Sequence, residues 1–354
     1  MNIHLVTAAL ASFILSSLIA PLLIRISYRF NLFIDDPKKR FHPANTHSKP
    51  IPRAGGLVVF LSVLIISLLF LEISKIVVGI LLGGLVIIII GLLDDIYDLN
   101  PFLRLVSNFV ISGIVIAFGL GIPYISNPFG GVIHLDTVIW TIQFLGTHHF
   151  LLWANLFSLM WIATIMNFVN WSSGVDGQLS GYVSVSSIFL GIFALRFSGY
   201  DISSMSVSTL CFIVSGAFAG FWLWNFYPQK IMPGYSGGTL AGYFLAVLSI
   251  LSFTKFGVLV MLLAIPLIDA FYVVIRRISQ KKSPFKGDAG HFHHRLISIG
   301  WGKRRIAIFY ALISAIYGFA ALYFTGWQKL SAVLIATVLL FLFILIIEEI
   351  KKNQ

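Results

Sequence analysis

Long apolar stretches recur along the whole chain and alternate with shorter polar connections. A membrane-spanning helix needs about 20 mainly apolar residues. The pattern predicts eleven transmembrane helices, at residues 3–24, 55–71, 76–93, 102–121, 148–167, 181–199, 206–225, 239–253, 256–275, 306–325 and 330–349. We therefore expect an all-α, polytopic integral membrane protein.

Composition supports the bilayer as the main solvent of this chain. Hydrophobic residues make up 58% of the 354 residues and charged residues only 10%, whereas soluble proteins carry about 25% charged residues. We expect one transmembrane domain over residues 1–354, with two large cytoplasmic loops at 25–54 and 276–305.

The basic residues indicate the orientation of the helices. With eleven spans, alternate connections place 20 of the 24 lysines and arginines on one side. Basic loops tend to remain cytoplasmic, so we expect the N-terminus outside and the C-terminus inside. The net charge of +11 reflects this bias and attraction to anionic lipids. It does not indicate a nucleic-acid partner, because the charges are divided among separate loops.

The first candidate motif runs over residues 47–56 and contains Lys49 and Arg53 before Gly55 and Gly56. Lys49 and Arg53 are candidate phosphate contacts. A glycine pair lets the backbone approach a ligand or another helix closely. Packing between helices is the more common reason for such a pair.

The second motif is acidic and lies at the predicted cytoplasmic end of the third helix. Asp94 and Asp95 are adjacent, and Asp98 follows. Adjacent carboxylates repel each other unless a cation compensates them, and acidic residues at the end of a span indicate function. A solvated helix end is the alternative, but it predicts mixed charges.

Two further motifs fall on the same side. Residues 167–177 follow the fifth helix and include Asn170 and Asp176, although Asn, Ser, Gly and Asp are also ordinary turn residues. Residues 231–242 form a glycine-rich stretch with Tyr235 that opens a helix. That geometry suits anion binding, and a flexible loop explains it equally well.

The fifth motif lies in the second basic loop and combines histidines with basic residues. This density can bind metal or phosphate, and its candidate residues are His291, His293, His294 and Arg295. Histidines on the opposite side are interpreted as interfacial bystanders; these are His134, His148 and His149.

Together the five motifs resemble those of the polyprenyl-phosphate N-acetylhexosamine-1-phosphate transferases, a glycosyltransferase family 4 type. The resemblance covers residues from about 35 to 305, and within residues 266–295 it looks like the undecaprenyl-phosphate GlcNAc-1-phosphate transferase branch. It implies a transmembrane catalytic domain in the plasma (inner) membrane. There it would transfer a sugar-1-phosphate from a UDP-N-acetylhexosamine to a polyprenyl phosphate at the cytoplasmic face, starting a cell-envelope glycan.

The resemblance also implies roles for individual residues. Asp94, Asp95 and Asp176 would be the catalytic and metal-binding carboxylates, with Mg²⁺ as the cofactor and Mn²⁺ as the alternative. The remaining candidates would bind the substrates; these are Lys49, Arg53, Asn170, Tyr235, His291, His293, His294 and Arg295.

Two positions depart from the family pattern. Ser173 stands where the family's loop usually has its first aspartate, and Tyr235 where the glycine-rich loop has an aspartate assigned to magnesium. These departures keep open a non-catalytic protein that binds lipid or nucleotide sugar. A transporter is the other alternative, but transport sites place ionisable residues near the bilayer midplane, whereas here they lie at the cytoplasmic ends.

Overall fold

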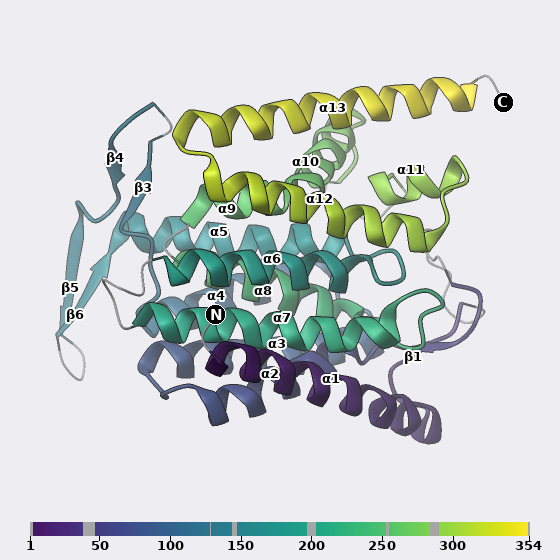
Figure 1. Cartoon of the computed structure of the whole chain (residues 1–354), viewed down its shortest axis with the longest axis horizontal. Coiled ribbons are helices and arrows are strands. Elements are labelled where there is room, and N and C mark those ends of the chain that lie inside the picture. Colours follow the sequence, from purple (N-terminus) through teal and green to yellow (C-terminus); the bar gives the residue numbers. More distant parts are fainter. Residues whose placement is uncertain are drawn as a thin grey trace.

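The computed structural model of the chain describes residues 3–37, 47–127, 129–143, 147–196, 203–252, 255–283 and 290–352. Figure 1 shows long helices lying side by side, with short strands at both ends of the bundle. The helices are α1 Ile3–Phe30, α2 Gly55–Phe70, α3 Lys75–Tyr97, α4 Pro101–Ala117, α5 Leu152–Trp171, α6 Gln178–Leu195, α7 Ser203–Asn225, α8 Gly234–Leu251, α9 Lys255–Leu262, α10 Ala264–Ser279, α11 Phe292–Ser298, α12 Lys303–Tyr323 and α13 Gly326–Lys352.

The fold is mostly helical, as predicted, and three two-stranded antiparallel hairpins add to it. They pair β1 Ile34–Asp35 with β2 Ile51–Pro52, β3 Tyr124–Ser126 with β4 Val132–His134, and β5 Ile139–Gln143 with β6 Thr147–Leu151. The β3–β6 strands lie at one end of the bundle, and β1 and α11 lie at the other (Figure 1).

The helices agree with a polytopic integral membrane protein. In the part of the chain that the structure describes, eight helices are long and apolar enough to cross a membrane, and the pair α9 and α10 makes a ninth if it is one span. Helices α2 and α4 are apolar but shorter. Each predicted span overlaps a helix, although the fifth begins only at Leu152, because residues 147–151 form strand β6. The predicted span residues 197–199 and 253 lie outside the described part of the chain.

The predicted ninth span is not one straight helix. Helices α9 and α10 meet at an angle of 87°. Pro266 lies in the first turn of α10, where it has no N–H to offer to Leu262, the last residue of α9, and its ring excludes a continuous helix through that carbonyl. The break directs α10 away from the axis of α9.

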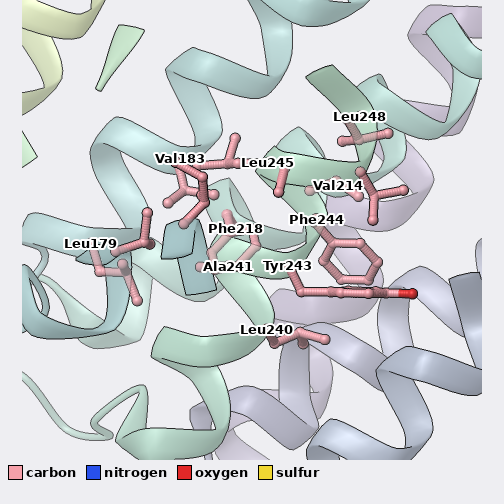
Figure 2. Close-up of a cluster of buried hydrophobic side chains, with 14 of the residues drawn as sticks. Leu179, Val183, Val214, Phe218, Leu240, Ala241, Tyr243, Phe244, Leu245 and Leu248 are labelled. Carbon is pink, nitrogen blue, oxygen red and sulfur yellow. The ribbon is translucent and has the colours of Figure 1, made fainter. Parts of the chain in front are cut away.

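The centre of the bundle is formed by α6, α7 and α8. Figure 2 shows Leu179 and Val183 of α6, Val214 and Phe218 of α7 and the α8 side chains around Phe244 gathered in one cluster. Helix α8, predicted from a short and glycine-rich segment, is the most buried of the candidate spans. Burial on all sides explains its uniformly apolar or small side chains.

Helix α7 also packs closely against α1. A side chain at Gly216 or Gly220 would collide with the α1 backbone. Across the same interface Ser12 Oγ donates to the Ile213 carbonyl and Ser16 Oγ to the Ala217 carbonyl, each at 2.7 Å. Small residues at four-residue spacing with hydrogen bonds between helices are typical of helix packing in membranes.

Candidate functional site

The glycine-rich segment that opens α8 lies at the centre of the site. The N–H groups of Gly55 and Gly56 donate to the carbonyls of Met232 and Pro233, at 3.0 and 3.1 Å. A side chain at Gly56 would collide with Ser236 and the backbone beside it. The glycine pair of the first motif therefore joins α2 to the start of α8, as the packing interpretation expects.

Asp95 holds the same segment from the other side. Its Oδ1 accepts from the Tyr235 N–H at 2.8 Å, and its Oδ2 accepts from the Ser236 hydroxyl at 2.9 Å and the Ser236 N–H at 3.3 Å. Gly234 has a φ of +70° and lies so close that any side chain there would collide with the carboxylate. The Asp95 side chain is 3% exposed. It thus orders the beginning of α8.

Asp94 is paired with Arg104, a base that contributed only to the predicted orientation of the helices. Its Oδ1 accepts from Arg104 Nε at 2.5 Å and from the Leu99 N–H at 3.2 Å. Arg104 also pairs with Asp98, which ends α3 in the left-handed conformation with a φ of 54°. Both hydrogen bonds to Asp94 use Oδ1.

The Tyr235 side chain lies beside this ion pair. The Arg104 guanidinium carbon is 5.2 Å from the centre of the Tyr235 ring, a cation–π distance. The phenol hydroxyl is 3.4 Å from Asn108 Oδ1 and 3.5 Å from the Arg104 carbonyl. Tyr235 therefore contacts the acidic motif through its backbone and packs on α4 with its ring.

Asn170 and its neighbours bring the third motif to the same place. A side chain at Gly238 would collide with the Asn170 amide, which explains glycine at that position of α8. The Ser173 hydroxyl donates to the Asn170 carbonyl at 2.6 Å, so the residue at the aspartate position closes the turn after α5.

Asp176 lies in a separate polar environment. Its Oδ1 accepts from Lys303 Nζ at 2.9 Å and its Oδ2 from the Gln229 N–H at 3.2 Å. Within the described ranges, no three His, Cys, Asp or Glu side chains are close enough to hold one metal ion. The structure therefore does not gather Asp94, Asp95 and Asp176 into a common ion site.

Arg53 contacts a buried carboxylate that the sequence analysis did not single out. Its Nε and Nη2 donate to Asp35 Oδ2 at 3.0 and 2.5 Å. The β1–β2 hairpin places Asp35 opposite Ile51, two residues before Arg53. His47 Nε2 is 3.5 Å from the same Asp35 oxygen. Lys49 is exposed.

The histidine motif approaches the turn after α5. His291 Nδ1 is 3.0 Å from Asp269 Oδ2, and the Phe292 N–H at the start of α11 donates to Asp269 Oδ1 at 2.8 Å. The His291 and His293 rings are stacked, with centroids 5.7 Å apart. A side chain at Gly174 would collide with the His293 ring.

One histidine of this motif is uncharged. Burial, followed by the neighbouring His294 and His291, holds the pKa of His293 well below its ordinary value. Arg295 donates from Nε to the Gly290 carbonyl at 3.2 Å and from Nη2 to the Tyr272 hydroxyl at 3.2 Å. His293 is therefore neutral near pH 7, and Arg295 is engaged in hydrogen bonds with Gly290 and Tyr272. Residues 284–289, which the resemblance included, lie outside the described ranges.

A large apolar cavity begins beside the histidine motif. Its volume is about 780 Å³, and α5, α9, α10 and α13 line it. Phe168, Phe271 and Phe341 contribute to its wall, and Arg276 is the one charged residue among the described residues that line it. Arg276 Nη1 donates to the Gly290 carbonyl at 3.4 Å, so the charged end of the cavity adjoins the motif.

The bystander interpretation of the outer histidines agrees with their position as far as it is described. His134 belongs to β4, at the end of the bundle opposite β1 and α11 (Figure 1). It lies 3.3 Å from Asp136. The side chains of His148 and His149 lie outside the described part of the chain.

The chain is similar to known proteins over the region that contains these motifs. A family described as Glycosyl transferase family 4 matches residues 77–253, which include the acidic motif, the turn after α5 and the start of α8. A Bacillus subtilis protein named "Probable undecaprenyl-phosphate N-acetylglucosaminyl 1-phosphate transferase" is 28% identical over 98% of this chain and 92% of its own length.

Two other relatives extend the comparison. The "Undecaprenyl-phosphate alpha-N-acetylglucosaminyl 1-phosphate transferase" of Thermotoga maritima is 26% identical over 81% of this chain and 78% of its own length. The "Phospho-N-acetylmuramoyl-pentapeptide-transferase" of Bacillus subtilis is 27% identical over 90% of this chain and 95% of its own.

Proposed function

Because the chain belongs to glycosyl transferase family 4, we propose that it transfers N-acetylglucosamine 1-phosphate from UDP-N-acetylglucosamine to a polyprenyl phosphate and releases UMP. Relatives along most of its length carry names of that activity with undecaprenyl phosphate. One observation carries the proposal: an apolar cavity with a single charged end opens beside a cluster of polar motifs. Such a site suits one lipid substrate and one anionic substrate.

The cavity suits the polyprenyl chain. Its wall is made mainly of aliphatic and aromatic side chains from four helices, so isoprenoid carbon can lie there without covering unpaired polar groups. Arg276 at the charged end would hold the lipid phosphate. This arrangement delivers the phosphate to the side of the site formed by the histidine motif and the turn after α5.

The reaction joins two anions, so positioning and charge compensation dominate it. An oxygen of the lipid phosphate attacks the phosphorus that carries the sugar, and the bond from that phosphorus to the bridging oxygen breaks. UMP leaves with that oxygen. A phosphate monoester has a second pKa of about 6, so the attacking phosphate is largely dianionic near pH 7 and needs no strong base.

Mg²⁺ fits this site as a cation shared between protein and substrate. It is commonly bound through one or two carboxylates, waters and substrate phosphates. The Asp94–Asp95 pair offers such a site, because the hydrogen bonds to Asp94 use only Oδ1. Asp176, paired with Lys303, would instead orient substrate. When bound, Mg²⁺ supplies positive charge against the phosphate oxygens, and Mn²⁺ is the alternative.

The orientation of the helices determines on which side of the membrane the site lies. We place all eleven predicted spans across the plasma membrane, with the N-terminus outside and the motifs at the cytoplasmic face. The distribution of lysine and arginine supports this orientation, and UDP-sugars are cytoplasmic substrates. The product would be the first lipid-linked intermediate of a cell-envelope glycan.

A direct assay tests the proposal. Purified protein in detergent is incubated with undecaprenyl phosphate, Mg²⁺ and a panel of UDP-sugars that includes UDP-MurNAc-pentapeptide, and UMP release is measured. We expect UMP release with UDP-N-acetylglucosamine and none when undecaprenyl phosphate is omitted. Folded protein that releases no UMP with any donor would support the non-catalytic alternative instead.

A further inference from the structure

Three basic side chains of the site lie beside buried carboxylates. They are His47 and Arg53 beside the β1–β2 hairpin and Lys303 at the start of α12, and we call them the basic bridge. His47 Nε2 and Arg53 Nη2 both lie beside Asp35 Oδ2, at 3.5 and 2.5 Å. Burial first, and then the charges of Arg53 and Lys303, lower the pKa of His47. Arg53 therefore pairs with Asp35 and Lys303 with Asp176.

His47 is the unusual member of the basic bridge. Its side chain is 3% exposed, yet among the described residues neither ring nitrogen makes a hydrogen bond of ordinary geometry. Its nearest acidic atom, Asp35 Oδ2, is 3.5 Å away and already accepts from Arg53. A buried polar group without a partner opposes folding, unless a ligand supplies the partner. The imidazole is in place to donate to an anion.

Lys303 forms an ion pair with Asp176, and a phosphate group could take the place of that carboxylate. Its Nζ pairs with Asp176 Oδ1 at 2.9 Å and lies 5.6 Å from the centre of the Tyr227 ring. Lys303 is the first residue of α12, where backbone N–H groups and the helix dipole also favour negative charge. A phosphate group arriving here would meet a positive side chain at a positive helix end.

We propose that His47, Arg53 and Lys303 form a subsite for a phosphate group, and that its occupant is the diphosphate of the nucleotide sugar. The inference rests on the proposed function and assigns the donor to a different part of the site from the histidine motif. His291 is engaged by Asp269, and Arg295 by Gly290 and Tyr272. Arg276 lines the apolar cavity, so we assign it to the lipid phosphate and the basic bridge to the donor.

Binding measurements test this without relying on turnover. Affinities for UDP, uridine and farnesyl phosphate are measured by calorimetry on the full chain in detergent. We expect Lys303→Gln and His47→Phe each to weaken UDP binding about tenfold while uridine binding changes less than twofold. Lys303→Arg should keep UDP affinity within threefold of the native value. Arg305→Gln is the matched control, because Arg305 is exposed and packs on Trp301, and it should change neither.

Thermal unfolding separates a ligand contact from a structural one. His47→Phe should leave the midpoint unchanged or raise it, because the variant removes unpartnered buried nitrogens. A lowered midpoint with unchanged UDP affinity would make the basic bridge structural and overturn the proposal. Farnesyl phosphate binding that weakens in place of UDP binding would assign the subsite to the acceptor and also overturn it.

The two proposals fail in different ways. Native protein that releases UMP, with UDP affinity unchanged in Lys303→Gln and His47→Phe, would overturn the subsite and leave the transferase activity standing. Native protein that binds UDP through the basic bridge but releases no UMP would support the subsite and overturn the activity.

Discussion

Asp94 and Asp95 are neighbours in the sequence but have different surroundings. Asp95 uses both carboxylate oxygens to hold the backbone and side chain at the start of α8. Asp94 pairs with Arg104 through one oxygen. Exchanging either carboxylate for an amide therefore has different consequences, because an amide nitrogen cannot accept the hydrogen bonds that Asp95 receives.

We expect Asp94→Asn and Asp95→Asn each to lower UMP release by about a hundredfold or more, as for loss of an electrostatic group at a reacting centre. Only Asp95→Asn should also lower the thermal unfolding midpoint by several degrees, because hydrogen bonds to a charged group contribute about 1.5–3 kcal/mol each. Equal midpoints for the two variants would contradict the structural role given to Asp95.

Tyr235 provides a second test at the scale of single residues. A phenol has an unperturbed pKa of about 10, so a neutral tyrosine does not replace a carboxylate as a magnesium ligand. We expect activity to require more Mg²⁺ than in relatives with aspartate at this position. Tyr235→Asp should lower the half-saturating Mg²⁺ concentration, since it puts a carboxylate beside the Arg104–Asp94 pair.

Tyr235→Phe is the control, because it keeps the ring on Arg104 and loses only the contacts of 3.4 and 3.5 Å made by the hydroxyl. Its Mg²⁺ dependence should match the native curve. If Tyr235→Asp also leaves Mg²⁺ dependence and rate unchanged, residue 235 takes no part in metal binding.

The sequence predicted the motifs of the site but not the partners of its carboxylates. Arg104 and Lys303 contributed only to the predicted orientation, because the bias of basic residues toward cytoplasmic loops is enough to explain a base at such a helix end. Their pairing with Asp94 and Asp176 depends on how α3, α4, α5 and α12 pack. The buried pair of Asp35 and Arg53 likewise depends on the β1–β2 hairpin. Strands of two residues are too short to be predicted from a sequence pattern.

At the scale of elements, the break between α9 and α10 and the hairpins β3–β6 were missed. Apolar length alone does not distinguish a straight span from one interrupted at Pro266. The strand Thr147–Leu151 pairs with Ile139–Gln143, and its apolar residues were counted as the start of a helix. Whether an apolar segment becomes a strand here depends on its partner strand, whereas the helices follow from the hydrophobicity of each segment alone.

Helices α9 and α10, which meet at the bend, both line the apolar cavity. The cavity predicts a lipid-specific variant. Thr337→Trp on α13 places an indole in the cavity wall. We expect it to raise the KM for undecaprenyl phosphate at least fivefold, with the KM for the UDP-sugar unchanged, because only the lipid uses that space. Kinetics with each substrate varied in turn would measure this.

Val338→Trp is the matched control for the cavity variant. Val338 is the next residue on α13 and is exposed, and it does not belong to the lining of the cavity. Its KM values should remain native. Equal effects of the two variants on the lipid KM would place the polyprenyl chain elsewhere.

At the scale of the whole molecule, helix length bears on how the bundle crosses the membrane. Helices α2 and α4 have 16 and 17 residues and rise about 24 and 26 Å, less than a hydrocarbon core of about 30 Å. Short spans are accommodated by local thinning of the bilayer and by flanking residues. Both helices pack against α3, which supports their place in the bundle.

Labelling of single cysteines tests the proposed topology. Cys211 is buried and is the only cysteine of the chain, so a Cys211→Ala background gives a low signal. We expect Asn100→Cys and Ser283→Cys to react only after the membrane is made permeable, and a tag after Gln354 to be cytoplasmic. Ser126→Cys and Trp327→Cys should react in intact cells with a thiol reagent that does not cross membranes.

The two positions expected to be external lie close together in the structure. Phe129, in the turn after Ser126, packs against Trp327 with ring centroids 4.9 Å apart. The two sites must therefore label from the same side, whatever the orientation of the bundle. Labelling of both only from the cytoplasm would invert the bundle and place the motifs outside, away from UDP-sugars. Labelling from opposite sides would contradict the packing of the β3–β4 hairpin against the start of α13.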